Sequence, residues 1–542
     1  MTDAPASSSS FPGADQPPGV RESRTSPGAN LRLITGYEPE APASAAGLRP
    51  DRMILPWDHD AAVAADSAMS ALEAAPDLYL QGGKLVEFTP TSETPRLQPL
   101  DQPRIREHLD RRVGWFNVAT GRTISPPPSV LSLVLARAPD GRFPVVRGVL
   151  DAPTIRPDGS ILSVPGYDPL TGLILAPNIV IEPTPANPSL EDARAAWERL
   201  RGEVLVDFPF RGDIDRAVAL ASLLTLVGRP TYSGPTPLFG VSANRRGTGK
   251  DLLVRSLATI AAGRPLDSSP PPESNSEMRR RITAMARSGV RVVLLGNVTE
   301  PLGGAALEDA MTTVNWTDRV LNQSTMTPSL TLSLTWFATG NNLRTKGDFA
   351  RRMLPIHLAS ADEFPEMRTG FRHDSLLAHV AADRASLLRD CLVILRAFHV
   401  AGRPEPPTRL GSFEAWSEAI AGAVHWVTGV DPIAAQAAVV ATDVGEDFRR
   451  RLIEGWAAIP GGTEGLTVRD AVAAIQTRDD LAGFREALEA EFATSDPRVL
   501  KRKLGNHLRT LYGCVVDGRV LTKVGRDGVQ NVARWAVRPQ TL

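Results

Sequence analysis

The sequence has few residues able to form disulfides or soft-metal sites. It contains two cysteines, Cys391 and Cys514, and eight histidines in 542 residues. The cysteines lie far apart without metal-site spacing, and no two histidines form an H-x-x-x-H pair. This pattern argues against a disulfide framework and against a zinc or other histidine-based metal centre. It fits the reducing environment of the cytoplasm, where we expect the protein to be located.

The sequence also lacks an excess of charge of one sign and a long apolar run. Its formal net charge is −1, so any DNA-binding charge must be local. The apolar stretch at residues 217–227 is too short to cross a bilayer. The N-terminus is rich in Ser and Pro and does not have the basic-then-apolar pattern of a secretory signal. We therefore expect no membrane partner. The length predicts roughly three or four domains.

One stretch, residues 237–254, has the features of a phosphate-binding loop. It reads as a short apolar strand, a glycine-bearing turn and the first turn of a helix. Such a loop needs small residues so that backbone N–H groups can surround phosphates, a helix N-terminus, and a Lys that reaches the outer phosphates. Gly247, Gly249 and Lys250 fill these roles. The candidate nucleotide-binding residues are Asn244, Arg245, Arg246, Gly247, Thr248, Gly249, Lys250, Asp251 and Leu252.

The loop departs from G-x-x-x-x-G-K-[ST] at two positions. Asn244 replaces the first glycine, and Asp251 replaces the Ser or Thr that binds Mg²⁺. Because Asn tolerates left-handed backbone angles better than most residues, we expect the turn to survive. On the motif alone, an ordinary strand-to-helix loop remains the alternative to nucleotide binding.

Composition and periodicity divide the chain into six predicted segments. The fold class is α/β, with a phosphate-loop ATPase core. Residues 51–185 alternate short strands and helices, and the basic helix at residues 104–112 is either a solvated face or a DNA contact. The segments are a disordered arm (1–50), an α+β accessory domain (51–185), a helical collar (186–235), the ATPase core (236–365), a helical lid or packing domain (366–460) and a winged helix (465–542).

Strands and helices alternate in the core segment, which predicts a parallel sheet with helices on both faces. Ligands of such sheets bind at the carboxyl ends of the strands. Three groups of polar residues follow predicted strands: Lys250, Gly296-Asn297 and Asn341-Asn342. We expect these groups to meet at one edge of the sheet.

The C-terminal segment combines three predicted helices with a basic hairpin that turns at Asp517-Gly518. This arrangement suggests a winged helix whose third helix and wing contact DNA. A solvated face on a protein–protein module is the alternative. The candidate DNA-binding residues are Arg498, Lys501, Arg502, Lys503, Asn506, Arg509, Arg519 and Lys523.

The order of motifs resembles a known family. The phosphate loop is followed by an apolar strand, Trp316-Thr317-Asp318-Arg319 and Thr339-Gly340-Asn341-Asn342. In this order, residues 200–430 resemble the ATPase part of phage- and mobile-element-type replicative helicases of superfamily 3, which belong to the AAA+ class. Residues 147–160 and 165–172 resemble segments that precede the ATPase in prophage primase/helicase proteins. The resemblance implies ATP and Mg²⁺ as cofactors, DNA as a partner, and a ring of six subunits. No primase catalytic domain is recognised, so a separate primase is a possible partner.

The resemblance also implies roles for individual residues. Lys250 would hold the β- and γ-phosphates, and Asn341 and Asn342 match the sensor that positions the attacking water. Arg351 and Arg352 match the position of an arginine finger inserted by a neighbouring subunit, with Arg319 as a second candidate and a surface salt bridge as the alternative. The hairpin at residues 320–332 corresponds to a DNA-gripping pore loop. It offers Asn322, Gln323 and Ser324 in place of a Lys.

The Asp with which this family organises Mg²⁺ is missing, because Gly296 stands at its position. Two interpretations follow. In the first, Asp251 supplies the missing charge to the metal and Glu300 reaches the water. In the second, the site has decayed, and the fold persists in a DNA-binding replication or regulatory protein.

Overall fold

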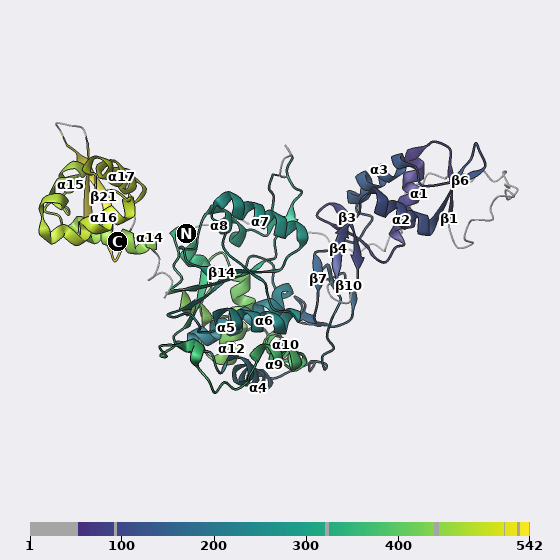
Figure 1. Cartoon of the computed structure of the whole chain (residues 1–542), viewed down its shortest axis with the longest axis horizontal. Helices are drawn as coiled ribbons and strands as arrows, with labels where there is room; N and C mark the ends of the chain where they lie inside the picture. Colours follow the sequence, from purple (N-terminus) through teal and green to yellow (C-terminus); the bar gives the residue numbers. More distant parts are fainter. Residues whose placement is uncertain are drawn as a thin grey trace, which may run out of the picture.

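The computed structural model describes residues 53–90, 95–319, 325–437, 444–513, 515–527 and 532–540. The predicted arm (1–50) and the predicted pore-loop residues Asn322, Gln323 and Ser324 lie outside this range. The described apolar side chains form three large clusters, drawn from residues 55–143, 152–435 and 448–537. Figure 1 shows the corresponding parts in purple to blue, teal to green, and yellow. The middle cluster contains the parallel sheet.

The N-terminal part is a mixture of helices and small sheets, as predicted. The carboxylates of Asp60 and Asp101 cap its first two helices. Two arginines of the predicted basic helix are in ion pairs, Arg104 with Glu87 at 3.4 Å and Arg112 with Asp77 at 3.5 Å. These pairs favour the solvated-face interpretation over a DNA contact. The elements are β1 (Met53–Trp57), α1 (Ala61–Glu73), β2 (Leu78–Gln81), β3 (Lys84–Thr89), β4 (Arg96–Pro99), α2 (Gln102–Arg112), β5 (Val113–Asn117), β6 (Arg122–Ile124) and α3 (Pro128–Arg137).

Short strands then join this part to the middle cluster. The hydroxyl of Thr154 donates a 2.6 Å hydrogen bond to the carbonyl of Val227, and Ile155 is buried in the middle cluster. Arg156 and Asp168 form an ion pair at 3.0 Å that holds the connection together. The strands are β7 (Gly148–Leu150), β8 (Thr154–Ile155), β9 (Ile161–Leu162), β10 (Gly166–Asp168) and β11 (Leu173–Leu175).

Two helices precede the sheet, as the sequence predicts. Ser189 begins the first with a capping box that it forms with Asp192. This helix ends in a π-helical turn, and the second helix is buried along most of its length. The elements are α4 (Leu190–Leu200), η3 (Arg201–Leu205), α5 (Asp213–Gly228) and η4 (Arg229–Thr231).

The core is a five-stranded parallel sheet in the order β13-β14-β17-β12-β18. The predicted parallel α/β arrangement is therefore confirmed. In Figure 1, α5, α6, α10 and α12 lie on one side of β14, and α7 and α8 lie on the other. The elements are β12 (Leu238–Ala243), α6 (Lys250–Ala262), β13 (Ser268–Ser269), α7 (Asn275–Ser288), β14 (Val292–Val298), α8 (Ala305–Thr312), β15 (Asn315–Trp316), β16 (Leu330–Thr331), β17 (Thr335–Asn341), η5 (Gly347–Arg352) and β18 (Met353–Leu358).

The prediction that a strand ends at Leu295 is wrong. β14 continues through Gly296 and Asn297 to Val298, with a shift of register between Leu295 and Val298. Asn297 has a φ of 53°, in the left-handed region that Asn tolerates. This irregularity turns the Asn297 side chain out of the sheet, where it is exposed.

The helices after β18 pack into the same cluster as the sheet. The helical stretch at residues 376–400 is interrupted at Asp383. Arg384, which follows the break, donates hydrogen bonds to the carbonyls of Ile260 and Ala261 at the end of α6. The elements are η6 (Pro365–Met367), α9 (Leu376–Ala382), α10 (Arg384–Val400), α11 (Glu414–Trp416), η7 (Ser417–Ala421), α12 (Gly422–Thr428) and η8 (Pro432–Ala435).

The C-terminal part has its own core and an antiparallel sheet in the order β19-β22-β21-β20. Asp517 and Gly518 have φ of 47° and 71°, which confirms the predicted hairpin turn. Phe448 and Trp456 of α14 belong to this core, although the sequence groups their segment with the lid. The elements are α14 (Val444–Ala458), β19 (Leu466–Thr467), α15 (Val468–Thr477), η9 (Asp479–Leu481), α16 (Ala482–Phe492), α17 (Pro497–Thr510), β20 (Val515–Val516), β21 (Arg519–Arg526) and β22 (Ala533–Pro539).

Candidate functional site

The phosphate loop connects β12 to α6. Gly247 and Gly249 have φ of 78° and 88°, a backbone conformation that favours glycine. Asn244 is not left-handed, so the role expected for it is wrong. Its side chain instead donates to the carbonyl of Ser360 at 3.0 Å and accepts from the Ser360 N–H at 3.3 Å. Asn244 therefore fastens the start of the loop to the segment that follows β18.

Lys250 is the first residue of α6 and makes the contact that defines the site. Its ammonium donates a 2.7 Å hydrogen bond to Oδ1 of Asn341, the last residue of β17. Burial lowers the pKa of Lys250 below its ordinary value, and nearby Asp251 partly opposes that effect. The expected meeting of Lys250 and Asn341 at the carboxyl edge of the sheet is therefore observed.

A cavity of about 290 Å³ lies beside the loop. It draws residues from the loop, from α6 and from the carboxyl ends of β14 and β17. Its positive groups, Arg246 and Lys250, outnumber its single carboxylate, Asp251, as a phosphate ligand would require. The lining residues are Arg246, Gly247, Gly249, Lys250, Asp251, Leu252, Asn297, Thr339, Gly340 and Asn341.

Asn297, expected at this edge of the sheet because it follows a predicted strand, lines the cavity, and so does Thr339, two residues before Asn341. Asn297 reaches the cavity because of the irregularity in β14. The Thr339 hydroxyl is buried and has no hydrogen-bond partner among the described residues. A polar group left unpaired in this way is costly unless a ligand satisfies it. Together with Asp251, these residues give the cavity oxygen atoms of the kind that Mg²⁺ prefers. The residues therefore fit a Mg²⁺ ion, which would neutralise phosphate charge.

Gly296 lies close to Ser268, so an acid at this position would require the Ser268 side chain to move. A Cβ atom at this position would lie 1.7 Å from the hydroxyl oxygen of Ser268 on the adjacent strand β13. Glu300, expected to reach the attacking water, is exposed and does not line the cavity. The only carboxylate among the lining residues is thus Asp251, which favours Asp251 over Glu300 as the acid of the site.

The segment at residues 359–375, here called the strap, connects β18 to α9 and packs against the phosphate loop. Arg245 donates a 2.9 Å hydrogen bond to the carbonyl of Glu363. A Cβ atom on Gly247 would lie 2.7 Å from a carboxylate oxygen of Glu366. The strap therefore explains the need for glycine at position 247. It also places a negative charge beside the loop.

The other predicted catalytic residues do not line this cavity. Arg352 is 12% exposed and forms ion pairs with Asp348 at 3.0 Å and with Glu308 at 3.6 Å. Arg351 pairs with Asp348 but remains 60% exposed. Arg319 forms a backbone bridge with Met326. In the backbone after β17, the N–H of Asn342 donates to the carbonyl of Ala243 at 3.1 Å. Of the two finger candidates in η5, Arg351 is the more accessible to another subunit.

The C-terminal basic helix α17 presents part of its charge to solvent. Arg498, Arg502, Asn506 and Arg509 are exposed and recur every three or four residues, so they lie along one face. Lys501 and Lys503 are half-buried, and the Lys503 ammonium donates a 2.6 Å hydrogen bond to the carbonyl of Phe492. Arg519 and Lys523 are exposed on β21. The exposed residues are consistent with a phosphate-contacting surface, whereas Lys503 serves packing.

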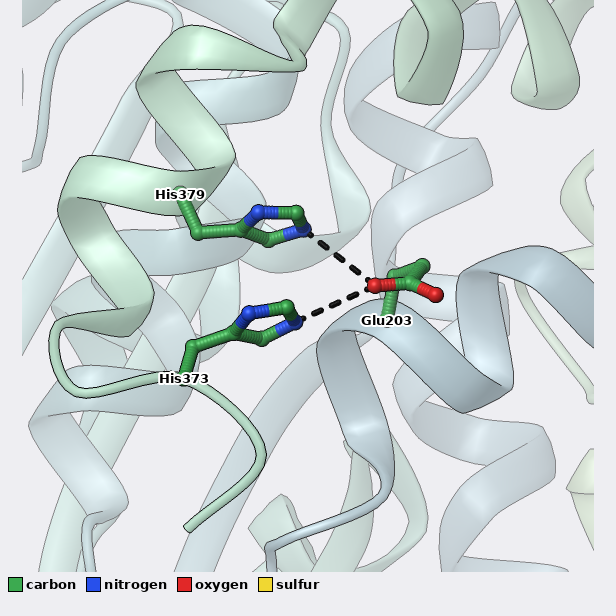
Figure 2. A group of neighbouring side chains, drawn as sticks. All are labelled: Glu203, His373 and His379. Carbon is green, nitrogen blue, oxygen red and sulfur yellow. Dashed lines mark hydrogen bonds and ion pairs between the residues drawn. The ribbon is translucent and has the colours of Figure 1, made fainter.

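The histidines are not all scattered in space. The rings of His373 and His379 stack with their centroids 3.6 Å apart, and both face the carboxylate of Glu203 (Figure 2). The sequence gives no sign of this cluster, because the spacing between the histidines is not a metal motif and Glu203 comes from a distant helix. The spacing of the histidines in the sequence, which argued against a histidine-based metal centre, therefore did not indicate this group of three side chains.

A larger cavity, about 780 Å³, is not beside the phosphate loop. It includes Arg291 and Thr335, which lie at the amino ends of β14 and β17, together with the buried Arg229. Burial and the neighbouring charge of Arg229 lower the pKa of Arg291 to about 10. This larger cavity lies at the opposite edge of the sheet from Lys250, so it is not the nucleotide site to which Lys250 belongs.

No family model and no curated protein matches the chain. Among solved structures, the apo C-terminal region of NrS-1 is similar at 12% identity, with 86% of this chain and 98% of that chain covered and a TM-score of 0.39. A second structure of that region, spanning its residues 305–718, is 12% identical with a TM-score of 0.37. A structure of JCV helicase with a bound acetamide compound is 12% identical, with 47% of this chain and 73% of that chain covered and a TM-score of 0.20. At these values the likenesses support no assignment of function. Among the described residues, no helix is both long and apolar enough to span a membrane.

Proposed function

We propose that this protein is an ATP-dependent DNA helicase or replication initiator of the phage or mobile-element type. ATP would bind at the phosphate loop, and a neighbouring copy in a ring of six subunits would complete each site. The proposal rests above all on the 2.7 Å contact between Lys250 and Asn341 across the loop cavity. This contact joins a phosphate-binding group to a polar group able to orient water.

In this mechanism, the amides around Gly247 and Gly249 and the N-terminus of α6 hold the phosphates. Lys250 neutralises the outer phosphates, and Asn341 positions the attacking water. Mg²⁺, held through Asp251, would supply further charge neutralisation. An arginine of the adjoining copy, most accessibly Arg351, would stabilise the charge that develops on the transferred phosphoryl group.

The remaining surfaces suit the same activity. The exposed residues of α17 and β21 would contact the DNA backbone as parts of a winged helix. A separate primase would supply the activity for which this chain shows no domain.

Two observations favour a second candidate function. Ser268 occupies the space that a strand-end carboxylate would need at position 296, and Glu366 places negative charge beside the loop. Both features suit a catalytically degenerate relative that binds DNA as a replication or regulatory protein. Such a protein would bind DNA in a salt-dependent manner that ATP and Mg²⁺ do not alter.

The test is ATP hydrolysis with and without single-stranded DNA. We expect DNA-stimulated turnover in the unmodified chain and its loss in Lys250→Ala. Lys84→Ala, which removes an exposed lysine of the N-terminal part, is the matched control and should behave as the unmodified chain. Equal rates in the unmodified chain and Lys250→Ala would refute the enzymatic proposal. If DNA binding by that unaltered chain were also insensitive to nucleotide, the degenerate relative would be the better description.

A further inference from the structure

Three potential metal ligands converge from separate parts of the chain. Glu203 lies in the π-helical turn η3, His373 lies in the strap, and His379 lies in α9. Figure 2 shows the two stacked rings directing one nitrogen each toward the same carboxylate oxygen. Nε2 of His373 is 3.1 Å from Oε2 of Glu203, and Nε2 of His379 is 3.5 Å from it.

These separations suit a shared cation. A tetrahedral Zn²⁺ with bonds of about 2.1 Å holds its ligand atoms about 3.4 Å apart. The two nitrogen-to-oxygen distances lie on either side of this value, and all three ligand atoms lie within 4.8 Å of one another. Only small movements of the side chains would therefore be needed to surround an ion.

The hydrogen bonding of the cluster leaves one ligand atom unsatisfied. Nε2 of His379 is buried and makes no hydrogen bond of good geometry among the described residues. The Glu203 oxygen that it faces already accepts hydrogen bonds from His373 and from Nε of Arg372, the latter at 3.2 Å. A bound ion would engage both imidazoles at once, while Arg372, whose guanidinium donates to both oxygens of Glu203, would orient the carboxylate, as partners of metal ligands commonly do.

We propose that Glu203, His373 and His379 bind a divalent transition metal ion, with Zn²⁺ as the best match to two imidazoles and one carboxylate. The fourth position is left for water. The ion ties the strap and α9 to the collar. The strap already has two hydrogen bonds to Asp207, from the N–H of Arg372 at 2.7 Å and from the Arg368 side chain at 2.6 Å.

The position of this site gives it a structural role beside the phosphate loop. The strap carries Glu363 and Glu366, which contact the phosphate loop. Phe208, five residues after Glu203, lies close to Gly249 of the same loop. Metal binding would therefore fix both the strap and the segment that follows Glu203 against the phosphate loop. The proposal does not depend on ATP hydrolysis, and its test does not measure turnover.

The test begins with titration of the full chain with Zn²⁺ in competition with a chromogenic chelator. We expect one tight site, with affinity reduced by more than roughly 100-fold in His373→Gln and in His379→Gln, since even outer partners of metal ligands contribute up to that factor. Two controls should retain binding. His59→Gln removes an exposed histidine, and His108→Gln removes the histidine of the second described cluster, which includes Asp77 and Glu87.

A second measurement needs no variant and so does not depend on how the variants fold. Diethyl pyrocarbonate modifies accessible imidazoles, and mass spectrometry locates the modified residues. Zn²⁺ should protect His373 and His379 and leave the modification of His59 unchanged. Absence of tight Zn²⁺ binding, binding that only His108→Gln removes, or equal modification of His373 and His379 with and without Zn²⁺ would each overturn the proposal.

Discussion

At the scale of single residues, the cavity beside Lys250 has oxygen ligands but lacks the usual strand-end acid. Asn297 stands nearest to that role, because the irregularity of β14 carries its side chain to the cavity. Gly296, the residue aligned with the acid by motif, faces Ser268 instead. We therefore expect position 297, and not position 296, to provide the strand-end group that contacts Mg²⁺.

Exchanging Asn297 for Asp should improve Mg²⁺-dependent nucleotide binding. Asn297→Asp adds a carboxylate among Lys250, Asp251 and Thr339 without changing the size of the side chain. Titration with a fluorescent ATP analogue should show a gain in affinity with Mg²⁺ and little gain without it. No gain with Mg²⁺ would show that the ion, if bound, does not contact this position.

A carboxylate placed one residue earlier, by Gly296→Asp, should have a different effect from Asn297→Asp. Gly296→Asp should destabilise the protein by at least about 1–3 kcal/mol, because its Cβ would overlap Ser268 and overpack the sheet. Thermal unfolding measures this cost. An unchanged melting temperature would mean that β13 moves away easily.

At the scale of elements, the strap and α17 set how the site and the DNA surface work. The strap covers one side of the phosphate loop, and its Glu366 lies against Gly247. Phosphates entering the loop would approach this carboxylate. The strap therefore acts against nucleotide binding in the arrangement described here.

Removing the charge of Glu366 should strengthen nucleotide binding. We expect Glu366→Gln to raise the affinity for ATP about fivefold, the effect of one exposed charge pair. Glu363→Gln is the matched control, because Glu363 contacts Arg245 through its backbone carbonyl and not through its side chain. Fluorescent-nucleotide titration at two salt concentrations checks the effect, which should shrink at high salt. Equal gains in both variants would point to general electrostatics and not to the strap.

The exposed face of α17 predicts different results for adjacent basic residues. Arg502→Gln should weaken binding to duplex DNA at all sequences and reduce the slope of log affinity against log salt by about 1. Lys503→Gln should leave that slope nearly unchanged and lower stability, because its ammonium holds the carbonyl of Phe492. Fluorescence anisotropy across a salt series, with thermal unfolding of both variants, checks the pair. Identical slopes for Arg502→Gln and the unmodified chain would favour the protein–protein alternative.

At the scale of the whole molecule, the finger candidates lie on η5 and do not line the cavity of their own subunit. Under the proposed function, either arginine would therefore act at the site of a second copy. Arg351 is the candidate that can reach it, because Arg352 is held by Glu308 and Asp348.

Mixing two inactive variants should restore activity. Arg351→Ala should still bind ATP yet lose about 10³-fold or more in turnover, as loss of an arginine finger does. Lys250→Ala should lose ATP binding. When the two are mixed, some interfaces pair an intact loop with an intact arginine, so turnover should reappear. The control is Arg216→Ala, which removes a partly exposed arginine of α5 that forms an ion pair with Asp213. Failure of the mixture to recover turnover would argue against a shared site.

Local patterns could predict the parts of the fold that depend on neighbours in the chain. Ser189 and Asp192 begin a helix through their own side chains, and Asp517-Gly518 turns a hairpin through its own backbone angles. The strand before Gly247 and the helix after Gly249 follow for the same reason. Boundaries were less predictable where packing decided them, as at Asp383, where a continuous apolar pattern hides a break between α9 and α10.

The sequence by itself determined the phosphate loop, the parallel α/β core and the basic C-terminal helix, because each is encoded by residues close together in the chain. Only the tertiary structure decided which groups meet. It brought Asn297 and Thr339 to the loop cavity, turned Lys503 inward, filled the space beside Gly296 with Ser268, and joined Glu203 to His373 and His379. These meetings depend on the order of strands and on the path of the strap across the loop, which no local spacing records.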